Sequence, residues 1–202
     1  MTPTGVAIFA KAPIEGFAKT RLIPRLGASG AALLQRRLIE RSVRTAVGAG
    51  LGPVSLWCAP DVEHDVFANL TARYDVRLYR QADGDLGARM LHTFETLTVH
   101  GPTLLMGTDC AVIAEAHLRH CAKLLSGTDA VAVPVEDGGY ILLGLRRALP
   151  SLFADIDWGT EAVMDQTRAR AAAASLDLAE LEPLWDIDIP KDYDRAVAQG
   201  VL

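Results

Sequence analysis

The chain lacks the long apolar runs and the basic excess that would point to a membrane or a nucleic acid. No stretch of its 202 residues is long and apolar enough to span a bilayer. The first five residues lack the basic segment and hydrophobic run of a secretory signal. The formal net charge is -5, whereas nucleic-acid-binding proteins usually present a basic face. We therefore expect a cytoplasmic protein with no membrane span and no nucleic-acid partner.

Cysteine is also scarce, with only Cys58, Cys110 and Cys121. An odd count, at spacings that match no metal motif, argues against a disulfide framework and favours reduced thiols. Half of the residues are hydrophobic and 22% are charged, which is typical of a globular protein. Because no internal repeat or linker is evident, the length suits a single domain over residues 1–202.

Short apolar runs alternate with longer amphipathic stretches along the chain. The apolar runs predict strands at residues 6–10, 54–58, 76–79, 103–106, 130–135 and 140–145. The amphipathic stretches predict helices at residues 27–49, 62–72, 87–98, 114–125, 160–174 and 190–199. Strands separated by helices indicate a mostly parallel sheet covered on both faces. The last two strands are joined by a tight turn, so we expect a local antiparallel pair and a mixed sheet.

The loop that follows the first strand, Lys11 to Arg25, is basic. It carries four cations and the single acid Glu15 in a chain that is otherwise negative, which indicates a small anionic ligand. Ligands of such folds bind beyond the carboxyl ends of the strands. Gly16 permits a positive φ or a close backbone approach, and lysine and arginine donors suit phosphate oxygens. The predicted nucleotide-binding residues here are Ala10, Lys11, Gly16, Lys19, Thr20 and Arg21.

This basic loop has two other interpretations. A solvated basic turn on the surface is one alternative. A P-loop is the other, with Lys19 and Thr20 as its last two residues. The P-loop fails on spacing, because Ala18 precedes Lys19 and the first glycine of the motif would fall at Ala12.

Carboxylates follow later strands at the same predicted edge of the sheet. Asp109 comes just after the strand at 103–106, where it could hold Mg²⁺ or Mn²⁺ against a pyrophosphate and act in catalysis. The alternative is a helix cap or an Asx turn. Asp188 could reach the same metal from the segment before the last helix. It could instead cap that helix, where Pro190 suits the first turn.

The turn Asp137-Gly138-Gly139 has two interpretations of similar weight. It is formally a hairpin turn between two strands. Its paired glycines would also let a sugar or an acceptor approach the backbone closely. On that interpretation Asp137 is a catalytic candidate on the acceptor side.

Two further segments carry candidate binding residues. Asp85, Gly87 and Arg89 begin a predicted helix whose N-terminus could receive an anion, although Asp85 could instead cap the helix. Trp158 precedes another helix. It could stack on a ligand ring, but a buried aromatic anchor is the commoner role of such a tryptophan.

Six ordered motifs together resemble a known bacterial family. They are Lys11-Ala-Pro with Gly16 and Lys19-Thr-Arg-Leu, Gly84-Asp-Leu-Gly-Ala-Arg-Met90, Gly107-Thr-Asp-Cys110, Asp137-Gly-Gly-Tyr140, Trp158-Gly-Thr160 and Asp186-Ile-Asp-Ile-Pro190. The set resembles the GT-A-type glycosyltransferases once known only as a domain of unknown function. Members carry the names arsenosugar-biosynthesis or radical-SAM/selenodomain-associated transferases. The set is more distantly similar to molybdopterin and phospholactate nucleotidyltransferases.

The resemblance covers nearly the whole chain and implies a nucleotide-diphospho-sugar transferase fold of the Rossmann-like GT-A type, with three α/β/α layers. It implies that Lys19 and Arg21 face phosphates and that Asp109 is the metal-side aspartate. Asp188 matches the late aspartate that completes the metal site in the nucleotidyltransferase relatives. The family usually has proline and threonine where this chain has Ala111 and Ile189, and neither change removes a carboxylate.

Three functional hypotheses follow. The first is a glycosyltransferase dependent on Mg²⁺ or Mn²⁺ that uses a nucleotide sugar and a small-molecule acceptor. The second is a nucleotidyltransferase that joins an NTP to a phosphorylated acceptor and releases pyrophosphate. The third is a nucleotide-binding or partner-docking protein without catalysis. The base, the sugar, the acceptor and the formation of a homodimer stay open.

Overall fold

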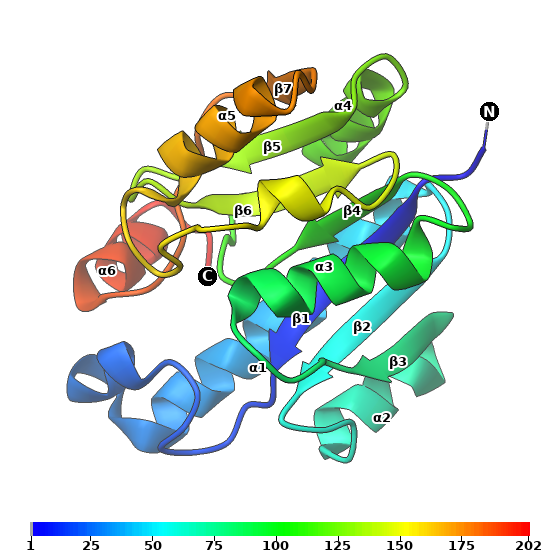
Figure 1. The fold of residues 1–202 in the computed structure, drawn as a ribbon. Helices are drawn as coiled ribbons and strands as arrows, with labels where there is room; N and C mark the ends of the chain where they lie inside the picture. Colours follow the sequence, from blue (N-terminus) through cyan, green and yellow to red (C-terminus); the bar gives the residue numbers. More distant parts are fainter. Residues whose placement is uncertain (1) are drawn as a thin grey trace.

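Seven strands form one mixed sheet in the computed structural model, which describes residues 2–202 (Figure 1). The strands are β1 (Gly5–Lys11), β2 (Val54–Ala59), β3 (Val76–Arg80), β4 (Thr103–Met106), β5 (Ala130–Pro134), β6 (Tyr140–Leu145) and β7 (Leu178–Glu180). Their order is β3-β2-β1-β4-β6-β5-β7. Strand β6 is antiparallel to β4 and β5, and the other pairs are parallel. The predicted α/β class, with a mixed and mostly parallel sheet, is confirmed.

Helices cover both faces of this sheet. They are α1 (Ile23–Ala49), α2 (Asp65–Arg73), α3 (Leu86–Leu97), α4 (Glu115–Leu125), α5 (Val163–Ala173) and α6 (Pro190–Ala198), with 3-10 turns at Thr20–Leu22 and Pro150–Leu152. Successive side chains of a strand point to opposite faces. Accordingly Val6 and Ile8 of β1 pack into the core beneath α1, α2 and α4, whereas Ala7 packs into the core beneath α3 and α5. Figure 1 shows α3 in front of the sheet and α1 behind it.

Some predicted boundaries differ from the structure. Gly27 has φ 71° and ψ 167°, so it breaks α1 near its start, at the residue where the sequence predicted the helix to begin. Helix α5 begins at Val163, not at residue 160. Strand β7 was not predicted, because three partly exposed residues carry no readable periodicity. In residues 2–202, no helix has both the length and the apolar character needed to cross a bilayer.

One edge of the sheet collects loops from most of the chain. All strands except β6 run in the same direction, so their carboxyl ends share this edge with the amino end of β6. The segment before α6 is held at the same edge. The Ile187 amide donates to the Asp109 carbonyl at 2.9 Å, and the Glu136 amide donates to the Leu184 carbonyl at 3.0 Å. Loops distant in sequence therefore meet beyond the ends of β1, β4 and β5.

Candidate active site

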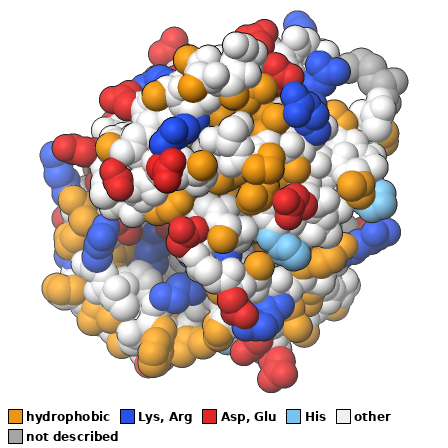
Figure 2. Space-filling model, viewed as in Figure 1, with side chains coloured by type: hydrophobic (Ala, Val, Ile, Leu, Met, Phe, Trp, Pro, Cys, Tyr) orange, Lys and Arg blue, Asp and Glu red, His pale blue; other side chains and the backbone are white. Residues whose placement is uncertain are grey.

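A cleft of about 950 Å³ opens at this edge of the sheet. Figure 2 shows the hollow at the left of this face, with Lys or Arg side chains inside it. Its volume lies within the range of small-molecule sites, roughly 300–1,000 Å³. The predicted site residues that line it are Lys11, Lys19, Thr20, Arg21, Arg89, Asp109 and Asp188.

Lys19 is the buried cation of the cleft. Its backbone is left-handed, with φ 47° and ψ 46°, which is uncommon for a residue other than glycine. Only 5% of its side chain is exposed, and its Nζ lies 2.9 Å from Asp109 Oδ1. The same Nζ donates to the Ile187 carbonyl at 2.6 Å. Lys19 thus joins the basic loop to β4 and to the segment before α6, and it is already paired.

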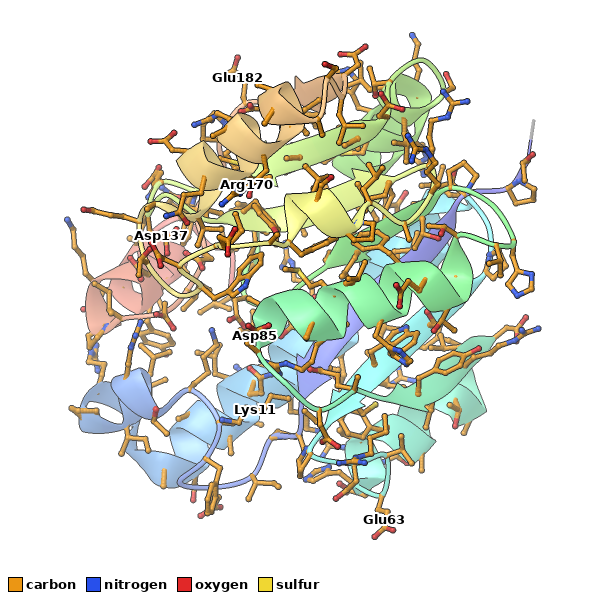
Figure 3. All side chains as sticks on the ribbon, in the orientation of Figure 1. Lys11, Glu63, Asp85, Asp137, Arg170 and Glu182 are labelled. Carbon is orange, nitrogen blue, oxygen red and sulfur yellow. The ribbon has the colours of Figure 1, made fainter. Side chains whose placement is uncertain are left out.

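Lys11 and Arg21 are the accessible cations of the basic loop that line the cleft. Arg21 pairs with Asp188, yet 70% of its side chain is exposed. Lys11 is exposed at the end of β1 and lines the cleft (Figure 3). Two exposed cations at the mouth suit an anionic ligand better than the enclosed Lys19 does.

Three carboxylates lie beside the cations of the basic loop in the cleft. Asp109, Asp186 and Asp188 all line it, and 45% of the Asp109 side chain is exposed. Burial raises the pKa of Asp186 to about 6, and the neighbouring charges of Asp137 and Asp109 contribute to the rise. We call Lys19, Arg21 and these three carboxylates the charged end of the cleft. Within residues 2–202, no three His, Cys, Asp or Glu side chains are arranged to hold a metal ion by themselves.

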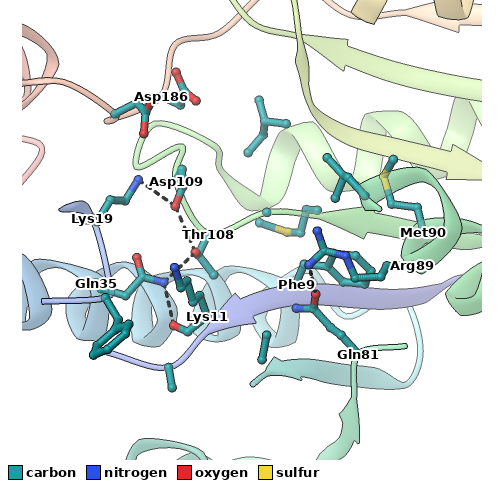
Figure 4. Close-up of a pocket in the computed structure, with 18 of the residues that line it drawn as sticks. Phe9, Lys11, Lys19, Gln35, Gln81, Arg89, Met90, Thr108, Asp109 and Asp186 are labelled. Carbon is teal, nitrogen blue, oxygen red and sulfur yellow. Dashed lines mark hydrogen bonds and ion pairs between the residues drawn. The ribbon is translucent and has the colours of Figure 1, made fainter. Parts of the chain in front are cut away.

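A buried glutamine lies beneath the charged end. Gln35 of α1 is 3% exposed, and its Nε2 donates to the Lys11 carbonyl at 3.0 Å and to Thr108 Oγ1 at 3.4 Å. The Thr108 hydroxyl donates in turn to Asp109 Oδ1 at 3.2 Å (Figure 4). The ends of β1 and β4 are therefore connected through side chains as well as through the sheet.

The other half of the cleft has a different character. Its apolar walls come from Phe9, Pro60, Leu86 and Met90, and with the pair of Gln81 and Arg89 we call them the apolar end. Arg89 Nη1 donates to Gln81 Oε1 at 3.1 Å, and Gln81 Nε2 donates to the Trp57 carbonyl at 2.9 Å. Both polar atoms of the buried Gln81 side chain are thus satisfied, while the arginine reaches the cleft.

Tyr140 lines the cleft at the start of β6. Burial raises the pKa of Tyr140 above its ordinary value, so its hydroxyl stays protonated at neutral pH. This residue, Gln35, Gln81, Thr108 and Asp186 were not among the predicted site residues. Tyr140, Thr108 and Asp186 do lie inside three of the six sequence motifs. One feature of the sequence could have pointed to Gln35: it is a polar residue at the helical spacing of the buried residues Ala31 and Leu38.

The helix ends decide which aspartates act as caps. Asp85 is the N-cap of α3, and its side chain accepts a hydrogen bond from the Ala88 amide at 2.8 Å. Neither Asp109 nor Asp188 is a cap, because Ala114 and Ile189 occupy the N-cap positions of α4 and α6. Asp85 does not line the cleft, whereas both of the other carboxylates do.

Two predicted glycines have packing roles. A Cβ on Gly87 would lie 2.6 Å from Nε1 of Trp158, and a Cβ on Gly138 would lie 2.1 Å from the Glu161 carbonyl. Trp158 packs near Phe153, with ring centroids 6.5 Å apart. None of these residues lines the cleft. The indole is thus an aromatic anchor, and Gly138 packs against the segment before α5 and offers no room for a sugar.

The remaining predicted residues lie around the cleft without lining it. Ala10 is fully buried in the core. Gly16 has the positive φ of 79° that the sequence suggested. Asp137 accepts a hydrogen bond from the Gly139 amide at 3.1 Å, within a hairpin turn across the hollow from Lys11 (Figure 3). Asp137 nevertheless acts on the charged end through its effect on the pKa of Asp186.

Solved structures share this fold over most of their length. A protein from Desulfovibrio desulfuricans G20, provisionally assigned as a nucleotide-diphospho-sugar transferase, is 26% identical with a TM-score of 0.85, over 94% of this chain and 84% of that one. A nucleotidyl transferase from Methanothermobacter thermautotrophicus is 16% identical, with a TM-score of 0.69 over 100% and 98%. A Mycobacterium tuberculosis H37Rv protein solved in complex with manganese is 18% identical, with a TM-score of 0.55 over 98% and 99%.

The structures from Methanothermobacter and Mycobacterium establish the fold alone. Together with the Desulfovibrio structure, they show that the chain has a nucleotide-diphospho-sugar transferase-like fold with nucleotidyltransferase neighbours. No curated protein matches the sequence significantly. One family model matches residues 42–160, which include β2 to β6 and both Asp109 and Asp137. The chain belongs to that family, which is described as an uncharacterized protein conserved in bacteria (DUF2064).

Proposed function

We propose that the chain is a metal-dependent glycosyltransferase that uses a nucleotide-diphospho-sugar donor. One observation carries the proposal: the basic loop after β1 meets the carboxylates of Asp109 and Asp188 on one wall of a cleft at the carboxyl edge of the sheet. Cations beside carboxylates are what a diphosphate bound with a divalent metal requires. The likeness to the Desulfovibrio protein, at 26% identity over 94% of this chain, supports the same donor class.

In this proposal Lys11 and Arg21 bind the diphosphate. Both are exposed at the mouth of the cleft, and a guanidinium can bind phosphate oxygens in a bidentate manner. Lys19 takes a different role from the one that the resemblance implied. Enclosed against Asp109 and the Ile187 carbonyl, it holds the loop in place and offsets part of the negative charge.

The residues present fit a Mg²⁺ or Mn²⁺ ion. Magnesium is usually held by one or two protein carboxylates together with substrate phosphates, so a complete protein ligand set is not needed. Asp109 and Asp188 are the proposed ligands. Asp109 Oδ1 accepts hydrogen bonds from both Lys19 and Thr108. Its other oxygen, Oδ2, has no donor among the described side chains. Such an ion would neutralise charge on the leaving nucleoside diphosphate.

The apolar end is the proposed site of the nucleoside, because planar rings favour apolar walls with a few polar groups. Arg89 lines that end. We place the acceptor on the side of Asp137. The negative charge of Asp137 contributes to the raised pKa of Asp186, and the same charge can attract a hydroxyl group of the acceptor. This assignment divides the substrate along the cleft, with the transferred sugar beside the charged end.

A product assay tests the proposal. Purified protein is incubated with Mn²⁺, a panel of sugar nucleotides and NTPs, and a mixture of hydroxylated and phosphorylated small-molecule acceptors, and both nucleoside diphosphate and pyrophosphate are measured. Release of nucleoside diphosphate from a sugar nucleotide, lost in Asp109→Asn and kept in the surface control Asp75→Asn, is the expected result. Pyrophosphate from an NTP would identify a nucleotidyltransferase. Binding without either product would identify a non-catalytic nucleotide-binding protein.

A further inference from the structure

A continuous chain of hydrogen bonds runs beneath the charged end. Gln35 Nε2 donates to the Lys11 carbonyl and to Thr108 Oγ1, Thr108 donates to Asp109 Oδ1, and Lys19 donates to the same oxygen. Figure 4 shows these four contacts as consecutive dashed lines between Lys19 and Lys11. This series of hydrogen bonds starts at α1, passes the ends of β1 and β4, and reaches the basic loop. Through Lys19, which also donates to the Ile187 carbonyl, it extends to the segment before α6.

Gln35 is held in this place by burial. Only 3% of the residue is exposed, and its one side-chain nitrogen uses both hydrogens, one on each strand end. A buried amide without partners costs free energy, so an alternative rotamer of Gln35 would be disfavoured. Leu34 and Leu38 pack on either side of it along the helix. The glutamine thus fixes the direction of the Thr108 hydroxyl: the oxygen accepts from Gln35, and its hydrogen points to Asp109.

The consequence concerns the carboxylate of Asp109. Two donors, from Thr108 and Lys19, converge on Oδ1. The carboxylate can then no longer rotate freely, and Oδ2 is the oxygen left for a ligand in the cleft. We propose that Gln35 and Thr108 are positioning residues that orient Asp109 toward its metal. This inference rests on the proposed function, since it assumes that Asp109 binds a divalent ion.

The test compares two substitutions at one position. Thr108→Val keeps the shape of the side chain but removes the hydroxyl, and Thr108→Ser restores the hydroxyl on a smaller side chain. The control is Thr103→Val, the same change in β4 at the opposite edge, where the hydroxyl donates to the Gly101 carbonyl. The dissociation constant of Mn²⁺ is measured by electron paramagnetic resonance, with and without inorganic pyrophosphate. The Mn²⁺ binding that is lost in Asp109→Asn is assigned to the site at Asp109. Circular dichroism confirms that each variant is folded.

We expect Thr108→Val to raise the Mn²⁺ dissociation constant by roughly tenfold or more, the usual effect of removing a partner that orients a metal ligand. Thr108→Ser should return it close to the wild-type value, and Thr103→Val should leave it unchanged. Gln35→Met, which removes both donated bonds at similar volume, should act in the same direction. A purely structural role of Thr108 would lower the thermal stability of Thr108→Val without a selective change in Mn²⁺ binding.

Two negative results have different meanings. If the wild-type protein binds Mn²⁺ and Thr108→Val binds it equally well, the positioning role is wrong and the proposed function stands. If the wild-type protein binds no Mn²⁺ even with pyrophosphate present, or Asp109→Asn binds it as well as wild type, the metal role of Asp109 is wrong. In that case the positioning role is overturned with it.

Discussion

The two ends of the cleft are built in opposite ways. At the charged end, each carboxylate that pairs with a cation is joined to a segment far away in sequence: Asp109 to Lys19, and Asp188 to Arg21. At the apolar end, Gln81 and Arg89 belong to neighbouring segments and bond to each other among apolar walls. The difference indicates a division of labour. The charged end can bind a diphosphate and stabilise developing charge, and the apolar end can bind the rest of a nucleotide.

The largest expected effect comes from removing charge at Asp109. Asp109→Asn should reduce turnover by roughly 10²–10³-fold, because preorganised electrostatic stabilisation commonly contributes more to catalysis than any other effect. Some loss of thermal stability should accompany it, because Lys19, whose side chain is only 5% exposed, loses its carboxylate partner. Initial rates measured at saturating donor and Mn²⁺ give the comparison. Full activity would show that the charged end has no role in the reaction.

The next largest effect is expected at Arg21. Arg21→Gln removes the exposed guanidinium that faces the mouth, so the dissociation constant for a nucleoside diphosphate should rise by roughly tenfold, the value of one hydrogen bond to a charged group. Isothermal titration at two salt concentrations measures it, and the wild-type affinity should fall more steeply with salt. Arg25→Gln is the control, because Arg25 pairs with Asp194 and does not line the cleft. An unchanged affinity in Arg21→Gln would remove this residue from the diphosphate site.

A smaller effect is expected at Arg89, and it tests whether the two ends of the cleft bind their ligands independently. Arg89→Met alters the apolar end and should weaken nucleotide binding by roughly threefold to tenfold, the value of one hydrogen bond. Mn²⁺ affinity should not change, because the side chain of Arg89 donates to Gln81 and to the Asp85 carbonyl, both outside the charged end. The control is Arg80→Met, which removes an exposed arginine paired with Asp83. If Arg89→Met lowered Mn²⁺ affinity as much as nucleotide affinity, the two ends would not be independent.

The smallest expected effect is on stability and depends on pH. The pKa of Asp186 is raised from 3.8 to about 6, so ionised Asp186 destabilises the folded state above pH 6, and this penalty disappears as the pH falls through 6 towards 4. Asp186→Asn should therefore raise the melting temperature at pH 8 by about 2–4 °C, equivalent to about 1 kcal/mol after allowance for partial exposure. The difference should vanish near pH 4. Differential scanning calorimetry across this range checks it, and an equal gain at both pH values would contradict the assigned cause.

The sequence predicts most of the fold but only part of the site. Short apolar runs located six of the strands and helical spacing located the six helices, because buried strands and one-sided helices leave a readable signal. The turn at Asp137 correctly indicated the antiparallel pair β5 and β6. Strand β7 and the break at Gly27 escaped, because a short edge strand and a single backbone torsion leave almost no pattern.

Roles within the site depend on three-dimensional contacts that spacing does not encode. Lys19 was expected to face phosphate, and the structure encloses it against Asp109 and the Ile187 carbonyl. Gly87 and Trp158 were candidate binding residues, with an aromatic anchor as the commoner role of the tryptophan, and they pack on each other. Gln35 was overlooked because a glutamine within a long amphipathic helix is ordinary unless its buried partners are known.

The most direct test of the central claim is anomalous diffraction from a crystal grown with Mn²⁺ and inorganic pyrophosphate. The account predicts a manganese peak within bonding distance of a carboxylate oxygen of Asp109, with pyrophosphate between it and the side chains of Lys11 and Arg21. Pyrophosphate bound away from the basic loop, or manganese bound away from Asp109, would contradict the account.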